Sequence, residues 1–236
     1  MAKAESVQTW AKVAGVLMLL SVVAGGFGES YVPSRLIVSS DAAATALNFA
    51  AHKALFRWGF VGYLVEAMCD IALSLIFYVL LRPVRRNVAL LAAFFGLIST
   101  ASFAACELFY LVPLLILGGG EYLKTFTLGQ LDTLALLSFR LFGYGGMMFT
   151  AFYGVAWMLR GWLIFRSGYL PRVLGVLMGI GGLAFFMRNF LLVLAPSHAP
   201  VFLLAVMLPG GLALPVWLLV KGVDAQGYEA VVDMSA

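Results

Sequence analysis

The chain alternates between long apolar stretches and short polar links. A helix needs about 20 apolar residues to cross a bilayer, and six stretches of the sequence approach or exceed that length. They cover approximately Trp10 to Gly28, Arg57 to Leu81, Asn87 to Leu117, Thr133 to Phe165, Arg172 to Ala195 and Val201 to Val220. This pattern predicts an all-α fold, a polytopic membrane helix bundle of about six transmembrane helices in a single domain over residues 1–236.

The link between the first two stretches predicts one further helix. Asp41 follows two serines and precedes an alanine-rich run, and an aspartate in that place can cap the free backbone amides of a helix start. We expect this helix to lie outside the bilayer, at its interface.

The composition excludes a soluble domain. Hydrophobic residues make up 63% of the chain and charged residues 11%, whereas soluble domains are about half apolar and about a quarter charged. The net charge of +4 comes from basic residues scattered at the ends of the apolar stretches. Because no basic run could follow a phosphate backbone, we expect membrane lipids and no nucleic acid as partners.

The basic residues predict how the spans are oriented. Six spans place both termini on one side of the membrane, and most basic residues fall on that side. They are Lys3, Lys12 and Lys221 and, in the links, Arg82, Arg85, Arg86, Arg160, Arg166 and Arg172. The other side receives only Arg35, Lys53, Arg57 and Lys124. Because cytoplasmic links carry an excess of Lys and Arg, we expect both termini in the cytoplasm.

Glycine and proline mark two of the spans. Gly175 and Gly179 form a GxxxG pair in the fifth span, which predicts close approach of a neighbouring helix. The last span contains Pro209, Gly210, Gly211 and Pro215, which together should kink or interrupt it.

A polar stripe starts at Asp41. Steps of 3.6 residues from there lead to Thr45, Asn48, His52, Leu55, Gly59, Tyr63, Glu66, Asp70 and Ser74. If the external helix continues into the second span without a register break, this stripe runs from the outer interface into the bilayer. Glu66 would then lie roughly 14 Å deep and Asp70 roughly 20 Å deep.

Charges in other spans fall at a similar depth. Glu107 of the third span, Arg140 of the fourth and Arg188 with Asn189 of the fifth all fall in the outer half. One charged residue at a helix centre costs at least about 2.5 kcal/mol, so these side chains should face one another or a wet cavity.

Two interpretations of this layer stay open: a structural network that fixes helix register, or a cavity with a function. The candidate cavity consists of Tyr63, Glu66, Asp70, Glu107, Arg140, Arg188 and Asn189. Its candidate entrance consists of Asp41, Thr45, Asn48, His52 and Arg57.

The sequence predicts no metal and no cofactor. His52 and His198 lie near the outer face without metal-ligand spacing, and they cannot form a transmembrane pair of haem ligands. Cys69 and Cys106 lie inside apolar stretches, where a thiol behaves as a small hydrophobe. No nucleophile or other catalytic motif is identifiable, so whether the protein is an enzyme stays undecided.

Five segments together resemble one known family. They are Asp41 to Asn48, Leu55 to Arg57, Leu81 to Asn87, Leu163 to Arg172 and Trp217 to Gly222. In this order they resemble the bacterial membrane family catalogued as domain of unknown function 4386. The resemblance implies a multi-pass protein of the bacterial inner membrane, and it implies no catalytic residue.

Three functional hypotheses remain. The first is binding of a small molecule or lipid in the charged cavity, for sensing or transport. The second is a membrane-embedded enzyme that modifies a lipid or isoprenoid. The third is an accessory subunit that binds a membrane protein partner through its apolar surface.

Overall fold

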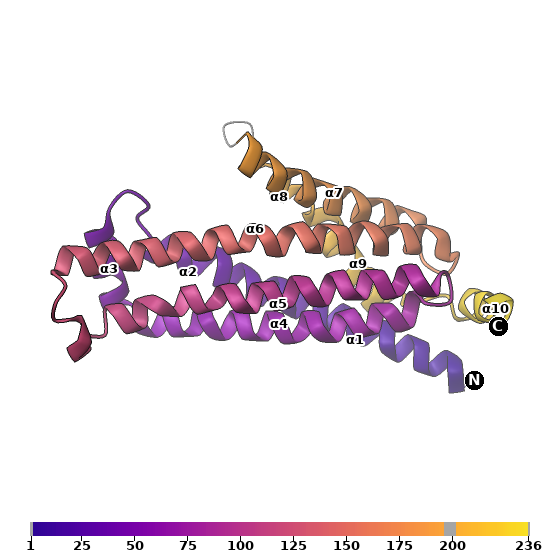
Figure 1. Cartoon of the computed structure of the whole chain (residues 1–236). Coiled ribbons are helices and arrows are strands. Elements are labelled where there is room, and N and C mark those ends of the chain that lie inside the picture. The colour runs from indigo at the N-terminus through magenta and orange to yellow at the C-terminus, as the bar shows by residue number, and fades with distance from the viewer. Residues whose placement is uncertain (1, 196–201, 236) are drawn as a thin grey trace. The chain divides into compact units, whose positions relative to one another are not determined.

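A computed structural model describes residues 2–195 and 202–235, and within these ranges every regular element is a helix (Figure 1). His198 lies outside the described residues. The prediction of an all-α membrane bundle is confirmed.

The elements follow one another without strands in the described ranges. They are α1 Ala2–Gly25, the π-helical turn η1 Gly26–Tyr31, α2 Val32–Leu36, α3 Ala42–Ala51, α4 Lys53–Leu81, α5 Arg86–Ile116, η2 Glu121–Leu123, α6 Leu128–Ser167, α7 Arg172–Leu194, α8 Phe202–Ala205, α9 Leu208–Val220 and α10 Ala225–Ser235. Asp41 caps α3 as predicted, because its side chain accepts from the Ala44 amide at 2.9 Å. Gly168, with φ of +75°, turns the chain between α6 and α7, a backbone conformation that suits glycine.

Five helices in the described ranges are long and apolar enough to cross a membrane, and a bent pair brings the number to as many as six. The bent pair consists of α9 and α10, which meet at 100°. Alone, α9 has 13 residues, or about 20 Å, which is less than the hydrocarbon thickness of about 30 Å. The sixth predicted span is therefore the least regular one.

Proline explains how the sixth apolar segment is divided. The helix stops at Ala205 and resumes at Leu208, so that Pro209 falls in the first turn of α9. A first helical turn tolerates proline because its amides have no partner within the helix. The predicted interruption is confirmed, and it lies just before the proline and glycine residues that predicted it.

The first span is longer than predicted. The candidate span runs from Ser6 to Leu36, whereas the sequence predicted an end at Gly28. The chain passes Pro33 by widening one turn: the Val32 amide donates to the Phe27 carbonyl, five residues back. This π-helical turn keeps the chain helical and brings Glu29 into the span.

The contacts divide the chain into two compact units. Unit 1 contains residues 1–20, 68–100 and 148–236, and unit 2 contains residues 21–67 and 101–147. Helices α1, α4, α5 and α6 each contribute residues to both units. The single domain stays a prediction.

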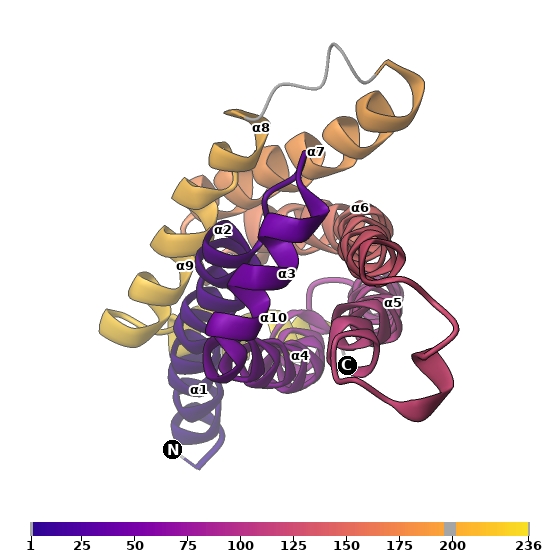
Figure 2. The ribbon, with the colours of Figure 1, turned by 90° about the vertical axis from the view of Figure 1, so that its left-hand side faces the viewer.

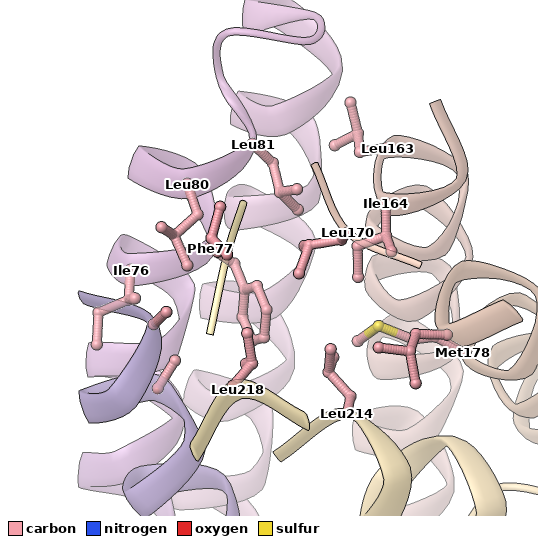
Figure 3. Packing of buried hydrophobic residues seen from close by; sticks show 14 of the residues in the cluster. Ile76, Phe77, Leu80, Leu81, Leu163, Ile164, Leu170, Met178, Leu214 and Leu218 are labelled. Carbon is pink, nitrogen blue, oxygen red and sulfur yellow. The ribbon is translucent and has the colours of Figure 1, made fainter. Parts of the chain in front are cut away.

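Unit 1 has an aliphatic core. Figure 3 shows its side chains converging from α4, α6, α7 and α9. The labelled residues are Ile76, Phe77, Leu80, Leu81, Leu163, Ile164, Leu170, Met178, Leu214 and Leu218. Helices α7 and α9 run side by side (Figure 2), and a Cβ added at Gly210 of α9 would lie 3.0 Å from the Leu177 carbonyl carbon of α7.

Glycines let α6 and α7 touch through their backbones within unit 1. A Cβ added at Gly161 would lie 2.6 Å from the Gly175 carbonyl oxygen and 2.7 Å from the Gly179 amide nitrogen. A Cβ at Gly154 would lie 2.6 Å from the Gly182 carbonyl oxygen. The close approach predicted from the GxxxG pair is confirmed, and glycines of α6 form its other half.

One end of unit 1 gathers both basic links and both terminal segments. The Gln8 side chain bonds the Val223 backbone, and Figure 1 draws N and C at this end. The Tyr169 hydroxyl donates to the Leu80 carbonyl at 2.6 Å, and its ring packs edge-on against Tyr228. Burial, with Tyr228 beside it, raises the pKa of Tyr169 above its ordinary value. Its hydroxyl therefore stays a neutral donor.

We expect Gly161→Ala to destabilise the protein and Gly143→Ala to leave it unchanged. Both glycines lie in α6, but a Cβ at Gly143 meets no atom within 4 Å. Overpacking costs about 1–3 kcal/mol, while alanine for glycine in an open helix is neutral or stabilising. Thermal unfolding in detergent measures both variants, and equal melting temperatures would contradict the close contact.

We expect Arg85→Cys and Asp233→Cys to react with an impermeant maleimide from one side of the membrane, and Tyr122→Cys from the other. The reason is that α5 has 31 residues, about 46 Å, and carries the chain across. A background without Cys69 and Cys106 removes the native thiols. Reaction of all three positions from one side would contradict the assigned span.

Candidate functional site

Three carboxyl groups of unit 2 lie within electrostatic range of Tyr63. Glu29 of η1, Glu66 of α4 and Glu107 of α5 all act electrostatically on the Tyr63 hydroxyl. Glu29 also acts on Glu107. We call these three glutamates the carboxyl cluster. The sequence predicted Glu66 and Glu107 as cavity residues, and it missed Glu29.

Backbone features bring the cluster together. The widened turn before Pro33 places Glu29 within electrostatic reach of Tyr63 and Glu107. Gly25 leaves room for Glu66, since a Cβ added there would lie 2.7 Å from both carboxyl oxygens. A proline five residues after the expected end of the span was the sequence signal for Glu29, because it predicts an irregular helix there.

The three carboxyls differ in burial. Glu29 is exposed, Glu66 is half-buried and Glu107 is only 3% exposed. The Oε1 atom of Glu107 is buried and has no hydrogen-bond partner among the described residues. A buried polar atom without a partner costs about 1–3 kcal/mol, more if it is charged, so this oxygen calls for a proton or a bound group.

Aromatic rings pack around Tyr63. The Tyr63 ring lies edge-on to Phe103, Tyr110 and Phe142, with centroids 5.5, 5.0 and 5.3 Å away. Its hydroxyl donates to the Gly28 carbonyl at 2.8 Å. In a π turn the Gly28 carbonyl would accept from the amide of the residue five positions later. That residue is Pro33, which has no amide hydrogen. Tyr63 thus supplies the donor that Pro33 lacks.

A second charged group lies in unit 1, where Asp70 of α4 interacts electrostatically with Arg160 of α6. Arg160 is 3% exposed and Asp70 is 5% exposed. The Arg160 Nη2 atom donates to Ser74 Oγ at 3.2 Å, and its guanidinium carbon lies 5.2 Å from the centre of the Phe77 ring. A Cβ at Gly96 would lie 2.6 Å from that Nη2 atom, so glycine makes room for the arginine.

The assignment of Arg160 to a cytoplasmic link was wrong. It lies inside α6 and is buried. Arg160 and Ser74 each lie seven residues before the end of their helices, at Ser167 and Leu81. Counting residues back from the end of each helix would have placed the two side chains at a similar depth in the membrane. Assigning charged residues to the links between spans did not.

The other predicted bases lie elsewhere. Arg140 is exposed, and its Nη2 atom donates to the Ser39 carbonyl at 2.6 Å. Arg188 of α7 is half-buried in unit 1, with its Nε atom unpaired among the described residues. Asn189 exchanges hydrogen bonds with Thr150 and donates to the Phe185 carbonyl at 2.8 Å. The structure thus divides the predicted layer between the two units.

The predicted entrance residues of α3 make local backbone contacts. Thr45 is buried and bonds Val38 and the Asp41 carbonyl, and the Asn48 amide donates to the Leu36 carbonyl at 3.4 Å. These bonds tie α3 to the end of the first span. These bonds give the polar side chains of Thr45 and Asn48 partners within the protein, so their presence needs no ligand.

The polar stripe is broken at His52. This residue ends α3 with φ of −125° and ψ of 35°, and its ring nitrogen bonds the Asn48 carbonyl at 3.0 Å. The condition for one continuous stripe is therefore not met. Helix α4 then passes Gly59 and Gly62 without interruption. Arg57 is exposed and lines a shallow pocket of about 570 Å³ with Lys53 and Trp58.

No group of three or more potential metal ligands occurs among the described residues. Cys69 and Cys106 form no disulfide among the described residues.

Comparisons with known proteins identify the family of the chain. A model of the family described as Domain of unknown function (DUF4386) matches residues 13–222. An uncharacterized protein of Archaeoglobus fulgidus is 25% identical over 134 residues, which cover 57% of this chain and 67% of that protein. No solved structure matches. Because the family match extends from the first span to the end of α9, the chain belongs to the family described as Domain of unknown function (DUF4386).

Proposed function

We propose that the protein binds a small organic cation in the carboxyl cluster, in competition with protons, and that this binding serves transport or sensing in the membrane. The single observation that carries the proposal is the buried Glu107 carboxyl, whose Oε1 atom lacks a partner among the described residues and which faces the charge of Glu29. Both features favour an added positive charge.

The chemistry of the cluster favours a cation over an anionic lipid. The charged groups that act on Tyr63 are carboxyls, and carboxylates form strong charge-assisted hydrogen bonds with ammonium groups. Aromatic rings pack against Tyr63, and the faces of such rings attract cations. An anionic headgroup would be repelled by the same glutamates.

The gradient in burial supports an entry route. A cation or proton meets the exposed Glu29 first, then the half-buried Glu66, and finally the buried Glu107. Each step keeps a counter-charge nearby, which lowers the cost of moving a charge into a dry site.

Asp70 and Arg160 have a different role in this proposal. An acid beside a base compensates its own charge, and both side chains are buried. We assign this pair to the stability of α4 against α6 within unit 1.

The termini lie in the cytoplasm and the protein in a cell membrane, because Arg82, Arg85 and Arg86 share one link.

We expect Glu107→Gln to weaken binding of tetraethylammonium by about tenfold or more. Tetraethylammonium has no N–H donor, so its attraction to the carboxylate is that of opposite charges in a poorly solvated site, and glutamine removes the negative charge. Calorimetric titration of the detergent-purified protein measures the affinity. Wild-type binding should also weaken as the pH falls, because protons neutralise the carboxylates.

Glu121→Gln is the matched control for charge. Glu121 is exposed and pairs with Lys124 at 2.6 Å, in the link between α5 and α6. This variant should bind tetraethylammonium like the wild type. The proposal fails if the wild type binds neither this probe nor tetramethylammonium, or if Glu107→Gln binds as tightly as the control.

We expect Asp70→Asn to lower stability by about 3–5 kcal/mol, because Arg160 would be left buried without its counter-charge. Asp132→Asn serves as a control, because Asp132 is only half-buried and lies near the start of α6. Thermal unfolding gives the comparison. Normal stability together with lost tetraethylammonium binding would move the functional site to Asp70.

A further inference from the structure

A pocket of about 1020 Å³ opens at the end of unit 1 where the basic link and the terminal segments meet. Its wall combines the start of α1, the end of α4, the link to α5 and the last helix, α10. Arg82, Arg85 and Arg86 line one part of it, and Trp10 and Val232 line another.

The three arginines have spare hydrogen-bonding capacity. All are exposed, and none makes a side-chain hydrogen bond or ion pair with another described residue. Each guanidinium carries five N–H donors in a planar fork that matches phosphate oxygens. Arg82 and Tyr228 both line the pocket, and the charge of Arg82 acts on the Tyr228 hydroxyl.

The start of α5 adds to this positive field. Helix α5 has 31 residues and begins at Arg86, and its first intrahelical bond runs from the Ala89 amide to the Arg85 carbonyl. The amides before Ala89 have no partner within the helix. A helix N-terminus binds anions through such amides, and here it lies beside the arginines.

The remaining wall fits an apolar chain next to an anion. Val7 is buried in the core of unit 1, and Trp10 packs against that core. Tryptophan is common where membrane meets water. Glu229 and Asp233 of α10 also line the pocket, and neither forms an ion pair with the arginines among the described residues. The lining therefore carries three bases against two acids.

We propose that this pocket binds a phosphate group, held by Arg82, Arg85 and Arg86 at the start of α5. The phosphate belongs either to the headgroup of an anionic phospholipid or to a soluble phosphorylated molecule. This site is separate from the carboxyl cluster and does not depend on the cation-binding proposal.

The test measures binding of dioleoylphosphatidylglycerol to the detergent-purified full chain by native mass spectrometry. Dioleoylphosphatidylcholine and inorganic phosphate form the parallel arms. The wild type should bind phosphatidylglycerol more tightly than phosphatidylcholine. Replacing Arg82, Arg85 and Arg86 by glutamine should weaken that binding about tenfold or more, because charge-assisted contacts are lost.

A variant with Arg35→Gln, Lys53→Gln and Arg57→Gln is the matched control, since it removes the same charge outside the pocket. It should bind phosphatidylglycerol like the wild type. Equal loss in both triple variants would show general charge attraction and overturn the proposal. The proposal would also be overturned if the variant without Arg82, Arg85 and Arg86 bound phosphatidylglycerol as tightly as the wild type does.

The inorganic phosphate arm decides between the two sources. If phosphate protects the wild type from thermal unfolding but not the pocket variant, and phosphatidylglycerol has no advantage over phosphatidylcholine, the ligand is a soluble phosphate compound. If neither phosphate nor phosphatidylglycerol binds the wild type, the proposal is overturned.

A second variant covers the case in which the arginine replacements do not fold. Glu229→Gln with Asp233→Asn removes the two acids from the lining. Phosphatidylglycerol or inorganic phosphate should then bind about threefold tighter or more, because the competing negative charge is gone. Unchanged or weaker binding would overturn the proposal.

Discussion

A polar group in hydrocarbon has no water to bind, so its partner must come from the protein itself. This constraint explains contacts far apart in the sequence. Arg160 bonds Ser74 and interacts electrostatically with Asp70, and Tyr63 bonds the Gly28 carbonyl that Pro33 leaves without an amide. In each case one helix completes the hydrogen bonding of another, which fixes the register of the two helices as well as satisfying the polar group.

Close packing of backbones is the second condition for these contacts. In membranes helices gain little from the hydrophobic effect and associate through small residues that allow close approach. Gly161 lets α6 touch α7, and Gly25 makes room for the Glu66 carboxyl. Gly96 does the same for the Arg160 guanidinium. Glycine therefore serves both the packing of the helices and the placement of charges within the protein.

The two charged groups contrast in how their charges are compensated. Asp70 and Arg160 are opposite charges within one unit, and such a buried pair holds its helices in place. The carboxyl cluster brings three acids within electrostatic range of one tyrosine, and Glu107 retains an oxygen without a partner among the described residues. In the proposed function, a bound cation supplies the partner that this Glu107 oxygen lacks.

The sequence by itself determined that the chain crosses a membrane, where most helices begin and end, that Asp41 caps a helix, and that Gly175 and Gly179 pack closely. These features depend on local composition and spacing, which a single sequence contains. Only the tertiary structure decided the partners: Arg160 with Asp70, Arg140 with Ser39, and Glu29 with Glu107. The reason is that helical spacing gives the face and depth of a side chain, whereas its partner depends on which helix lies opposite and on local breaks such as those at Pro33 and His52.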